Sequence, residues 1–411
     1  LLIGKNNMGK QFTFINARVI DPKVESATSG TLTINDGLIE KRDGGIKGKV
    51  IDCGGMCLAP GIIDIGVKVC EPGEKHKESF RSASNAAAIG GVTSLVTRPD
   101  TKPSIDNPEL LEFFKNRGRE FSKVRIFPTA SLTKKNNGKK MTEIGFLHEG
   151  GAVAFTDGFN SIPNTKTFYT ILKYASDFDT LIIGHPQDHF LTQNTSASSG
   201  VFASIKGLSS SPNIAEKIGI ERDTALVNNI NIRYHVDQIT TKIGLDVLRH
   251  AKKNNKRLTA GTSIHHILFN ELDIGNYRTF FKLKPPLRNN IDREALTEAI
   301  KEGLIDNICS MHTPQDEESK RLPFEEAAPG AVGLETILPA SLSLYHNKVL
   351  TLNQIFRLLA FNPAEIIKKK LGSLEEGYPA DIIVFDPDKP VKIDRFKFQS
   401  KSQNTPFDGF N

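Results

Sequence analysis

The sequence predicts an α/β protein, a (β/α)8 TIM-type barrel with a small β domain that is formed by both ends of the chain. Three observations lead to this prediction. Short β-branched runs alternate with helical segments from Gly61 to about residue 370. Eight of these runs are typical of strands, which is the number that closes such a barrel. The stretches on either side carry strand and turn patterns of their own, so we expect one barrel and one small sheet.

Composition limits the classes of protein that this chain can represent. Its 411 residues are 38% hydrophobic and 24% charged, and 53 Lys+Arg against 47 Asp+Glu leave a net charge of +6 without blocks of one sign. We therefore expect no nucleic-acid partner. No apolar run approaches the ~18 residues of a membrane span, and no signal peptide is visible, so a cytoplasmic protein without a membrane partner is expected. The four cysteines are too few for a disulfide framework and are expected to be free thiols: Cys53, Cys57, Cys70 and Cys309.

Residues 1–60 are expected to form the N-terminal part of the small β domain. The segments FTFINARVI, GTLTINDGLIE and KVIDCGGMCLAPG alternate apolar and polar residues between turn signals, which predicts antiparallel strands. The chain begins with Leu1 and its first methionine is Met8, so residues 1–7 are expected to lie outside the native product.

Residues 61–370 are expected to form the barrel. Each predicted strand is a run of four to seven residues rich in Val, Ile, Leu and Thr, bounded by turn or helix signals. These runs cover 62–67, 92–97, 124–129, 152–155, 180–184, 230–236, 258–263 and 307–311.

The helices between the strands carry start and stop signals. The segment ESFRSASNAAAIGG ends on Gly90 and Gly91. In DREALTEAIKEGL, Asp292 is placed to cap the helix and Gly303 to stop it. The segment 191–212 is rich in Ser, Asn and Gly without periodicity, so it is expected to be an exposed loop.

The last part of the chain, residues 371–411, returns to a β pattern in GSLEEGYPADIIVFDPD. Because this pattern matches that of the N-terminal part, we expect the two ends of the chain to meet in one sheet. The chain stops at SKSQNTPFDGFN without completing the β pattern, so this part of the small domain is expected to be truncated.

Six sequence blocks carry a family resemblance. In chain order they read PGIID with EPGE, AAAIGGVTSLVTRPDT, KLKPPLRNNIDREAL, GLIDNICSMHTPQDEESK and GAVGLETILP. Together they resemble a dihydroorotase of the amidohydrolase superfamily, and the resemblance runs from about residue 12 to residue 411. It implies the barrel of that superfamily, with the working residues at the carboxyl ends of the strands.

The resemblance also implies a metal site that this chain does not carry. The family places a His-x-His pair on the first strand, where Gly66 and Lys68 stand here, and neither offers a free lone pair at neutral pH. The aspartate that acts as metal ligand and general base on the last strand corresponds to Met311, whose thioether cannot accept a proton from water. We therefore assign no catalytic residue, because the position of the base is occupied by Met311.

The substrate contacts implied by the resemblance have changed as well. Cys70 stands where the family has an arginine that binds the substrate carboxylate, and Asp100 stands where it has an asparagine. An acid at position 100 would repel an anionic substrate, and Arg98 lies at a different position on its strand. Gly66, Lys68, Cys70, Asp100 and His312 are therefore interpreted as a vestigial pocket.

Three candidate metal ligands remain. By resemblance, His185 in GHPQD and His265 in SIHH match ligand histidines, and Asp157 in AFTDG matches the bridging carboxylate. Three such ligands can hold zinc, but the two imidazoles are expected to be buried core residues. With the partners missing, we expect these positions to be unoccupied, with no cofactor. An alternative hypothesis is that the Lys68 ammonium replaces the cation and pairs with Asp157.

Three functions remain open. The first is a catalytically inactive dihydroorotase-like protein of pyrimidine biosynthesis, because inactive members of this family assemble with aspartate transcarbamoylase as structural subunits in homo- or hetero-oligomers. The second is an active zinc-dependent cyclic amidohydrolase that uses Asp157, His185 and His265, with His312 as the base. The third is a binding protein that senses a pyrimidine intermediate in the old pocket, which Cys70 and Asp100 disfavour.

Overall fold

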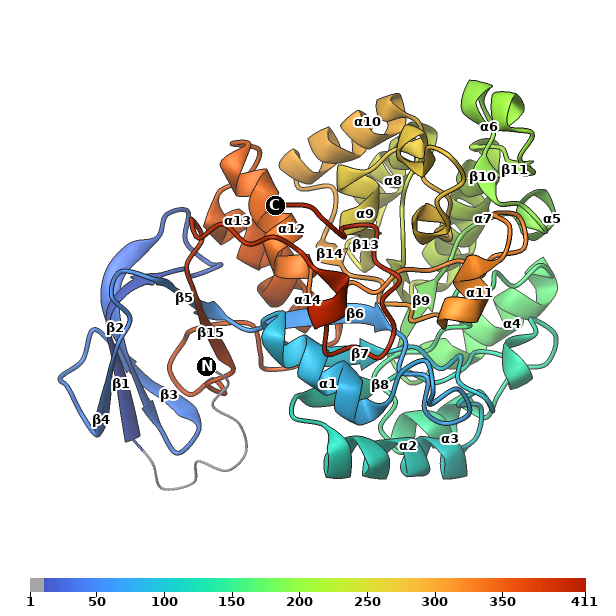
Figure 1. The fold of residues 1–411 in the computed structure, drawn as a ribbon. Coiled ribbons are helices and arrows are strands. Elements are labelled where there is room, and N and C mark those ends of the chain that lie inside the picture. The colour runs from blue at the N-terminus through green and yellow to red at the C-terminus, as the bar shows by residue number, and fades with distance from the viewer. Residues whose placement is uncertain (1–10) are drawn as a thin grey trace.

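Parallel strands follow one another around a barrel in the computed structural model, which describes residues 11–411 (Figure 1). One run of parallel strands joins β6 to β7 and β8, and a second joins β9 to β12, β13 and β14. The predicted barrel is confirmed. Its strands are β6 (Ile62–Val67), β7 (Val92–Thr97), β8 (Arg125–Pro128), β9 (Leu181–Gly184), β12 (Arg233–Val236), β13 (Leu258–Ser263) and β14 (Asn307–Cys309).

The fourth position of the barrel is taken by a bridging segment instead of a strand. The run predicted at 152–155 pairs only through Phe155, which bridges Ala130 on one side and Ile182 on the other. The segment is too short for a regular ladder because it lies between the turn after α3 (Ile144–Glu149) and the turn at 158–159. Its backbone groups are still bonded to both neighbours, so the wall is continuous.

The barrel closes between β6 and the segment that follows β14. Ser310 donates its backbone N–H to Asp64 Oδ1 at 2.8 Å, and Lys68 donates its backbone N–H to the His312 carbonyl at 2.9 Å. This contact places residues 310–312 directly beside the carboxyl end of the first strand. The two ends of the expected site therefore lie together.

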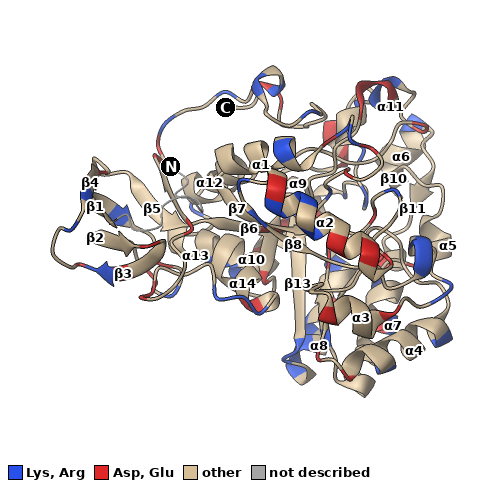
Figure 2. Ribbon diagram, turned by 90° about the horizontal axis from the view of Figure 1, so that it is seen from below, with Lys and Arg blue, Asp and Glu red and all other residues tan. Residues whose placement is uncertain are grey.

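Helices cover the outside of the barrel (Figure 1), and basic and acidic residues are interspersed over them (Figure 2). The last of these helices covers residues 362–366 and directly follows a π-helical turn at 357–361. The longer helices are α1 (Phe80–Ile89), α2 (Pro108–Phe121), α4 (Thr165–Ser176), α7 (Ile214–Ile230), α8 (Lys242–Asn254), α10 (Asn290–Lys301) and α12 (Ile337–His346), and the shorter ones are α5 (His189–Thr192), α6 (Val201–Lys206), α9 (Ile264–Leu268), α11 (Glu317–Arg321), α13 (Leu352–Phe356) and α14 (Asn362–Ile366).

The expected helix boundaries hold for α1 and need one correction for α10. Ser79 caps α1 in a capping box, and Gly90 follows its last residue. The cap of α10 is Asn289, not Asp292, because the Asp292 carboxylate instead accepts the Lys242 N–H at 2.8 Å and the Asn213 side-chain amide at 2.7 Å. The Asp292 carboxylate thus connects α10 to Lys242 and Asn213, and only the tertiary packing determines these contacts.

The segment 191–212 is more ordered than its composition predicts. It contains α6 and a two-stranded parallel pair, β10 (Ala197–Ser198) with β11 (Ser210–Ser211). Ala197 and Ser198 are buried, and the Arg288 guanidinium donates to the Ser198 hydroxyl at 3.3 Å. The exposed-loop prediction is therefore wrong for this part of the segment.

Both chain ends contribute to the small sheet, whose order is β15-β5-β1-β2-β3, with β4 also paired to β1. The sheet is mixed and not purely antiparallel as expected, because β1 runs parallel to both β4 and β5. Leucine, isoleucine and phenylalanine side chains form its own core. Its strands are β1 (Gln11–Val19), β2 (Thr28–Asn35), β3 (Leu38–Arg42), β4 (Lys49–Asp52), β5 (Cys57–Pro60) and β15 (Ile382–Phe385), and residues 1–7 lie outside the described part of the chain.

After β15 the chain leaves the sheet and crosses the barrel (Figure 1). The Ser400 hydroxyl donates to the buried Glu78 carboxylate, Asn404 donates to the carbonyls of Thr313 and Gly330, and Phe407 is 3% exposed. This differs from the assignment of 371–411 to the small β domain, because the apolar and amide side chains of this tail are buried against the barrel.

No helix within residues 11–411 combines the length and apolar character that crossing a bilayer requires. All four cysteines are buried and unpaired, as predicted.

Candidate functional site

The first strand ends in a backbone irregularity at Gly66. The register with β7 shifts between Ile65 and Val67, and Gly66 has φ = +93°, a conformation that favours glycine. A Cβ atom built on Gly66 would lie 2.6 Å from Met311 Sδ. The Met311 thioether therefore fills the space that a side chain on this part of the strand would occupy.

Lys68 belongs to a cluster of ion pairs. Its Nζ lies 3.2 Å from Asp100 Oδ2 and 3.8 Å from Glu74 Oε2, while Arg98 donates to both oxygens of Asp100 at 3.1 and 3.2 Å. Burial alone would raise the pKa of Asp100, but Arg98 and Lys68 outweigh it and hold that pKa well below its usual range. Asp100 is thus an anion that two cations neutralise.

Asp157 has a different partner from the one proposed for it. Its Oδ1 accepts the Thr133 N–H at 2.9 Å, and the Thr133 hydroxyl donates to Oδ2. No ion pair joins Asp157 to a cation within residues 11–411, so the hypothesis of a Lys68–Asp157 pair is wrong: Lys68 is drawn to Asp100 and Glu74 instead. Because Asp157 is 2% exposed, burial raises its pKa to about 6.

Replacing Asp157 with asparagine is expected to change how stability depends on pH. The folded-state pKa of about 6 lies above the ordinary value of 3.8, so folding favours the protonated acid and the native chain loses stability as the pH rises through this window. Asparagine does not titrate. Between about pH 5 and about pH 8, the variant should therefore gain roughly 1 kcal/mol on the native chain. Urea unfolding at both pH values measures this difference, and parallel curves would contradict it.

His185 and His265, the two histidines expected as metal ligands, contact different partners. His185 Nδ1 lies 3.5 Å from Asp237 Oδ2, and its ring packs against Phe159 with 5.5 Å between ring centroids. The His265 ring packs against Phe407 of the C-terminal tail at 5.3 Å, and burial lowers its pKa to about 3. Burial likewise lowers the pKa of His185, although Asp237 opposes the shift.

His312, the candidate base, is fully buried and does not face an open space. Its Nδ1 accepts the Gly333 N–H at 3.2 Å, and its Nε2 lies 3.4 Å from Glu78 Oε2. Burial alone would raise the pKa of Glu78, but His312 and Ser400 lower it. Both ring nitrogens of His312 therefore face buried groups of the protein, the Gly333 N–H and the Glu78 carboxylate.

These positions do not assemble a metal site. Asp157, His185 and His265 each turn to another neighbour, and no group of three or more His, Cys, Asp or Glu side chains in the described chain is arranged to hold a metal ion. A remaining cavity of about 10 Å³ beside Gly66 and Asp237 has room for about one water molecule. The residues present do not fit zinc.

A larger cavity of about 680 Å³ lies beside the small space at Gly66 and Asp237. It is lined by residues after β9, including His185 and Gln187, and by the segments 282–286 and 325–329. Among these, only His185 is marked as a candidate site residue by the sequence. The block KLKPPLRN contains the two lysines of the lining, but its pattern indicates the family and not a binding role for them.

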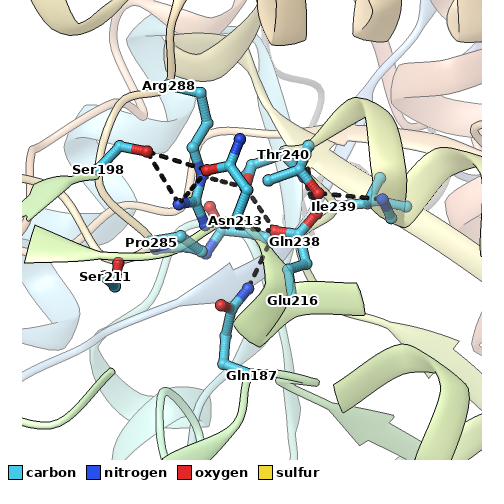
Figure 3. A network of polar contacts seen from close by, with 12 residues as sticks. Gln187, Ser198, Ser211, Asn213, Glu216, Gln238, Ile239, Thr240, Pro285 and Arg288 are labelled. Carbon is cyan, nitrogen blue, oxygen red and sulfur yellow. Dashed lines mark hydrogen bonds and ion pairs between the residues drawn. The ribbon is translucent and has the colours of Figure 1, made fainter. Parts of the chain in front are cut away.

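A buried polar network supports the wall of this cavity (Figure 3). Glu216 is fully buried and accepts from Thr240, Thr241 and Gln187, and Arg288 Nη2 lies 3.6 Å from its Oε2. Burial alone would raise the pKa of Glu216, but Arg288 and the hydrogen bonds lower it. Gln187 and Pro285 line the cavity and belong to the segments that this network holds in place.

Comparisons with known proteins support this architecture. A family model described as Dihydro-orotase-like matches residues 55–244. The dihydroorotase of Ehrlichia canis (strain Jake) is 38% identical over 403 residues, covering 96% of this chain and 90% of the relative. That of Bacillus pumilus (strain SAFR-032) is 40% identical over 376 residues, covering 90% and 86%.

Among solved structures, the L-hydantoinase of Arthrobacter aurescens has the same fold, with a TM-score of 0.88 at 23% identity over 98% of this chain and 92% of that one. The sequence matches extend along almost the whole barrel and both parts of the small sheet. This chain belongs to the dihydroorotase family.

Proposed function

We propose that this chain is a catalytically inactive dihydroorotase-family protein of pyrimidine biosynthesis. The observation that carries the proposal is the contact between Gly66 and Met311: the position of the first-strand ligand has no side chain, and the position of the base fills its space with a thioether. The Lys68–Asp100–Arg98 cluster adds to this, because it neutralises charges that would otherwise contact metal or substrate. The proposed protein uses no cofactor.

The role proposed for such a protein is structural. By family resemblance, its partner is aspartate transcarbamoylase in the cytoplasm, and the two form a hetero-oligomer that this chain supports without turning over substrate. Neither nucleic acid nor membrane is a proposed partner. The interspersed charges along the barrel helices support this part of the proposal (Figure 2).

The names of the relatives favour a second function, an active zinc-dependent dihydroorotase that interconverts dihydroorotate and N-carbamoyl-aspartate. Zinc would supply a Lewis acid and an activated water. This alternative requires a rearrangement that brings Asp157, His185 and His265 together, and a base other than Met311 and His312. The comparisons favour it, whereas the geometry of the described residues favours the inactive protein.

A single set of samples distinguishes the two functions. Dihydroorotase activity is measured on zinc-supplemented protein, alone and mixed with the aspartate transcarbamoylase of the same organism, with zinc content and complex size recorded. We expect no turnover, no stoichiometric zinc and a larger complex on mixing. Turnover that rises with bound zinc would overturn the inactive function and establish the second one.

Restoring the three family residues is expected to leave the chain inactive. The variant Gly66→His, Lys68→His, Met311→Asp places an imidazole at a backbone φ of +93° and leaves Cys70 and Asp100 at the substrate positions. Zinc binding is measured by metal analysis and turnover by the dihydroorotate assay. Measurable turnover by this triple variant would contradict the prediction and show that the site needs only its ligands.

A further inference from the structure

Another cavity, of about 540 Å³, lies at the end of the barrel opposite the candidate functional site. Its walls come from the residues at which three parallel strands begin and from α14. Leu181 is the first residue of β9, Arg233 is the first residue of β12, and Arg257 directly precedes β13. The working residues of such barrels lie at the carboxyl ends of the strands, so a cavity at the amino ends is separate from the family's own site.

Positive charge prevails in the lining of this cavity. Its four cations are Arg233, Lys256, Arg257 and Lys368, and its three carboxylates are those of Asp179, Asp306 and Glu365. Asp306 is already paired with a cation outside the lining, because Lys252 Nζ lies 2.6 Å from its Oδ2. The other two carboxylates cannot balance four cations, so the cavity keeps an excess of positive charge. Figure 2 shows that basic residues gather where α8 ends, close to this cavity.

One carboxylate, that of Asp179, is shared between several of these cations. Arg257 donates to its Oδ1 and Lys368 donates to its Oδ2. Lys368, Arg257 and Arg233 together hold the pKa of Asp179 below its usual range. Each guanidinium carries five N–H donors, more than one carboxylate can satisfy. The cluster therefore has donors to offer to a further anion.

Arg233 is half-buried and is held at the wall of the cavity by backbone groups. Its guanidinium donates to the carbonyl of Asp179 at 3.4 Å and to the carbonyl of Ile366. No carboxylate of the described chain lies within 4.0 Å of its side-chain nitrogens. Burial lowers the pKa of Arg233, and Arg257 adds to this effect although Asp179 opposes it. A cation that is removed from water without a counter-ion favours the arrival of an anion.

We propose that this cavity binds a phosphate group, held by the guanidinium groups of Arg233 and Arg257 and by the ammonium of Lys368. Two planar guanidinium groups suit a phosphate, because each can donate two parallel N–H bonds to its oxygens. A phosphate dianion also matches the excess of positive charge in the lining. The cavity has the size of a small-molecule site, and Leu181 and Ile366 add apolar surface for the body of a phosphorylated molecule.

This inference goes beyond the proposed function and does not depend on it, since binding at the amino ends of the strands requires neither metal nor turnover. The test compares AMP with adenosine, which has the same body without the phosphate, by isothermal titration calorimetry on the full chain at constant ionic strength. We expect AMP to bind about 10- to 100-fold more tightly than adenosine. Equal binding of AMP and adenosine, or no binding of AMP and of inorganic phosphate at millimolar concentration, would overturn the inference.

Inorganic phosphate distinguishes the two sources of the group. Binding as tight as that of AMP identifies free phosphate as the ligand, because the body then adds nothing. Weaker binding than that of AMP identifies a phosphorylated small molecule, whose body contacts the apolar part of the lining.

A pair of arginine variants locates the site. Arg257→Met removes one guanidinium from the cavity, and we expect it to weaken binding of AMP about tenfold or more. Arg249→Met is the control, because Arg249 lies on α8, pairs with Asp246 and Glu302, and is not part of the lining. It should bind AMP like the native chain. Circular dichroism confirms that both variants fold, and native-like binding by folded Arg257→Met would overturn the inference.

Asp179→Asn is expected to change binding in the opposite direction. It removes the carboxylate that competes with phosphate for Arg257 and Lys368, so AMP should bind about three- to tenfold more tightly. A merely structural role of Asp179 would not tighten binding. Unchanged or weaker binding by the folded variant would therefore overturn the inference, whereas turnover of dihydroorotate in the separate assay would overturn only the inactive function.

Discussion

Replacing Arg288 with methionine is expected to lower the free energy of unfolding by about 3–5 kcal/mol. The guanidinium lies beside Glu216, which is fully buried, and Arg288 Nε donates to the Thr240 hydroxyl at 3.0 Å. Its loss leaves a buried carboxylate without a counter-ion. Urea unfolding, followed by circular dichroism, measures the change.

The control for this prediction is an exposed ion pair of the same residue types. Arg321 and Glu317 pair on α11 with side chains that are 72% and 73% exposed, so Arg321→Met should have almost no effect on stability. Adding Glu216→Gln to Arg288→Met removes the uncompensated charge and should recover part of the loss. An Arg288→Met protein as stable as the native one would show that water or rearrangement neutralises Glu216.

Replacing Gly66 with alanine is expected to destabilise the protein by about 2–4 kcal/mol. Two effects combine: the φ of +93° is unfavourable for alanine, and the new Cβ would lie 2.6 Å from Met311 Sδ. The free energy of unfolding in urea measures the sum. A loss below about 1 kcal/mol would show that this part of the barrel adapts freely.

The two effects can be separated. Gly37 has φ = +76°, and within the described chain a Cβ atom at this position would meet no heavy atom within 4 Å, so Gly37→Ala should show the backbone cost alone. In a Met311→Ala background, the overlap at position 66 disappears, and the cost of Gly66→Ala should fall by about 1 kcal/mol or more. Simple additivity of the two substitutions would contradict the claim that Met311 fills the space beside Gly66.

Much of the fold could be predicted from local patterns. The predicted runs from 62–67 to 307–311 carry β-branched residues and, apart from 152–155, contain strands, and the start and stop signals around 78–91 belong to the residues that form α1. The glycine at position 66 and the methionine at position 311, from which the proposal of an inactive protein starts, are also visible in the sequence. The expectation of free thiols likewise follows from the small number of cysteines, and all four are unpaired.

The partners of the site residues could not be predicted in this way. Residue types alone suggest a pair between Lys68 and Asp157, but Lys68 contacts Asp100 and Glu74. Likewise, His312 accepts the Gly333 N–H and lies beside Glu78, two contacts that its residue type does not indicate. Each of these contacts joins residues on different strands or loops. Sequence spacing carries no information about which loop folds over which.

What the sequence by itself determined is therefore the barrel, the meeting of the two chain ends in one sheet, and the residue types at Gly66, Lys68 and Met311 on which the proposed function rests. The tertiary structure alone decided that Met311 fills the space beside Gly66 and that a cavity lined by Arg233 and Arg257 lies at the other end of the barrel. The physical reason is that residue type sets what a side chain can do, whereas packing between distant segments sets which atoms it meets.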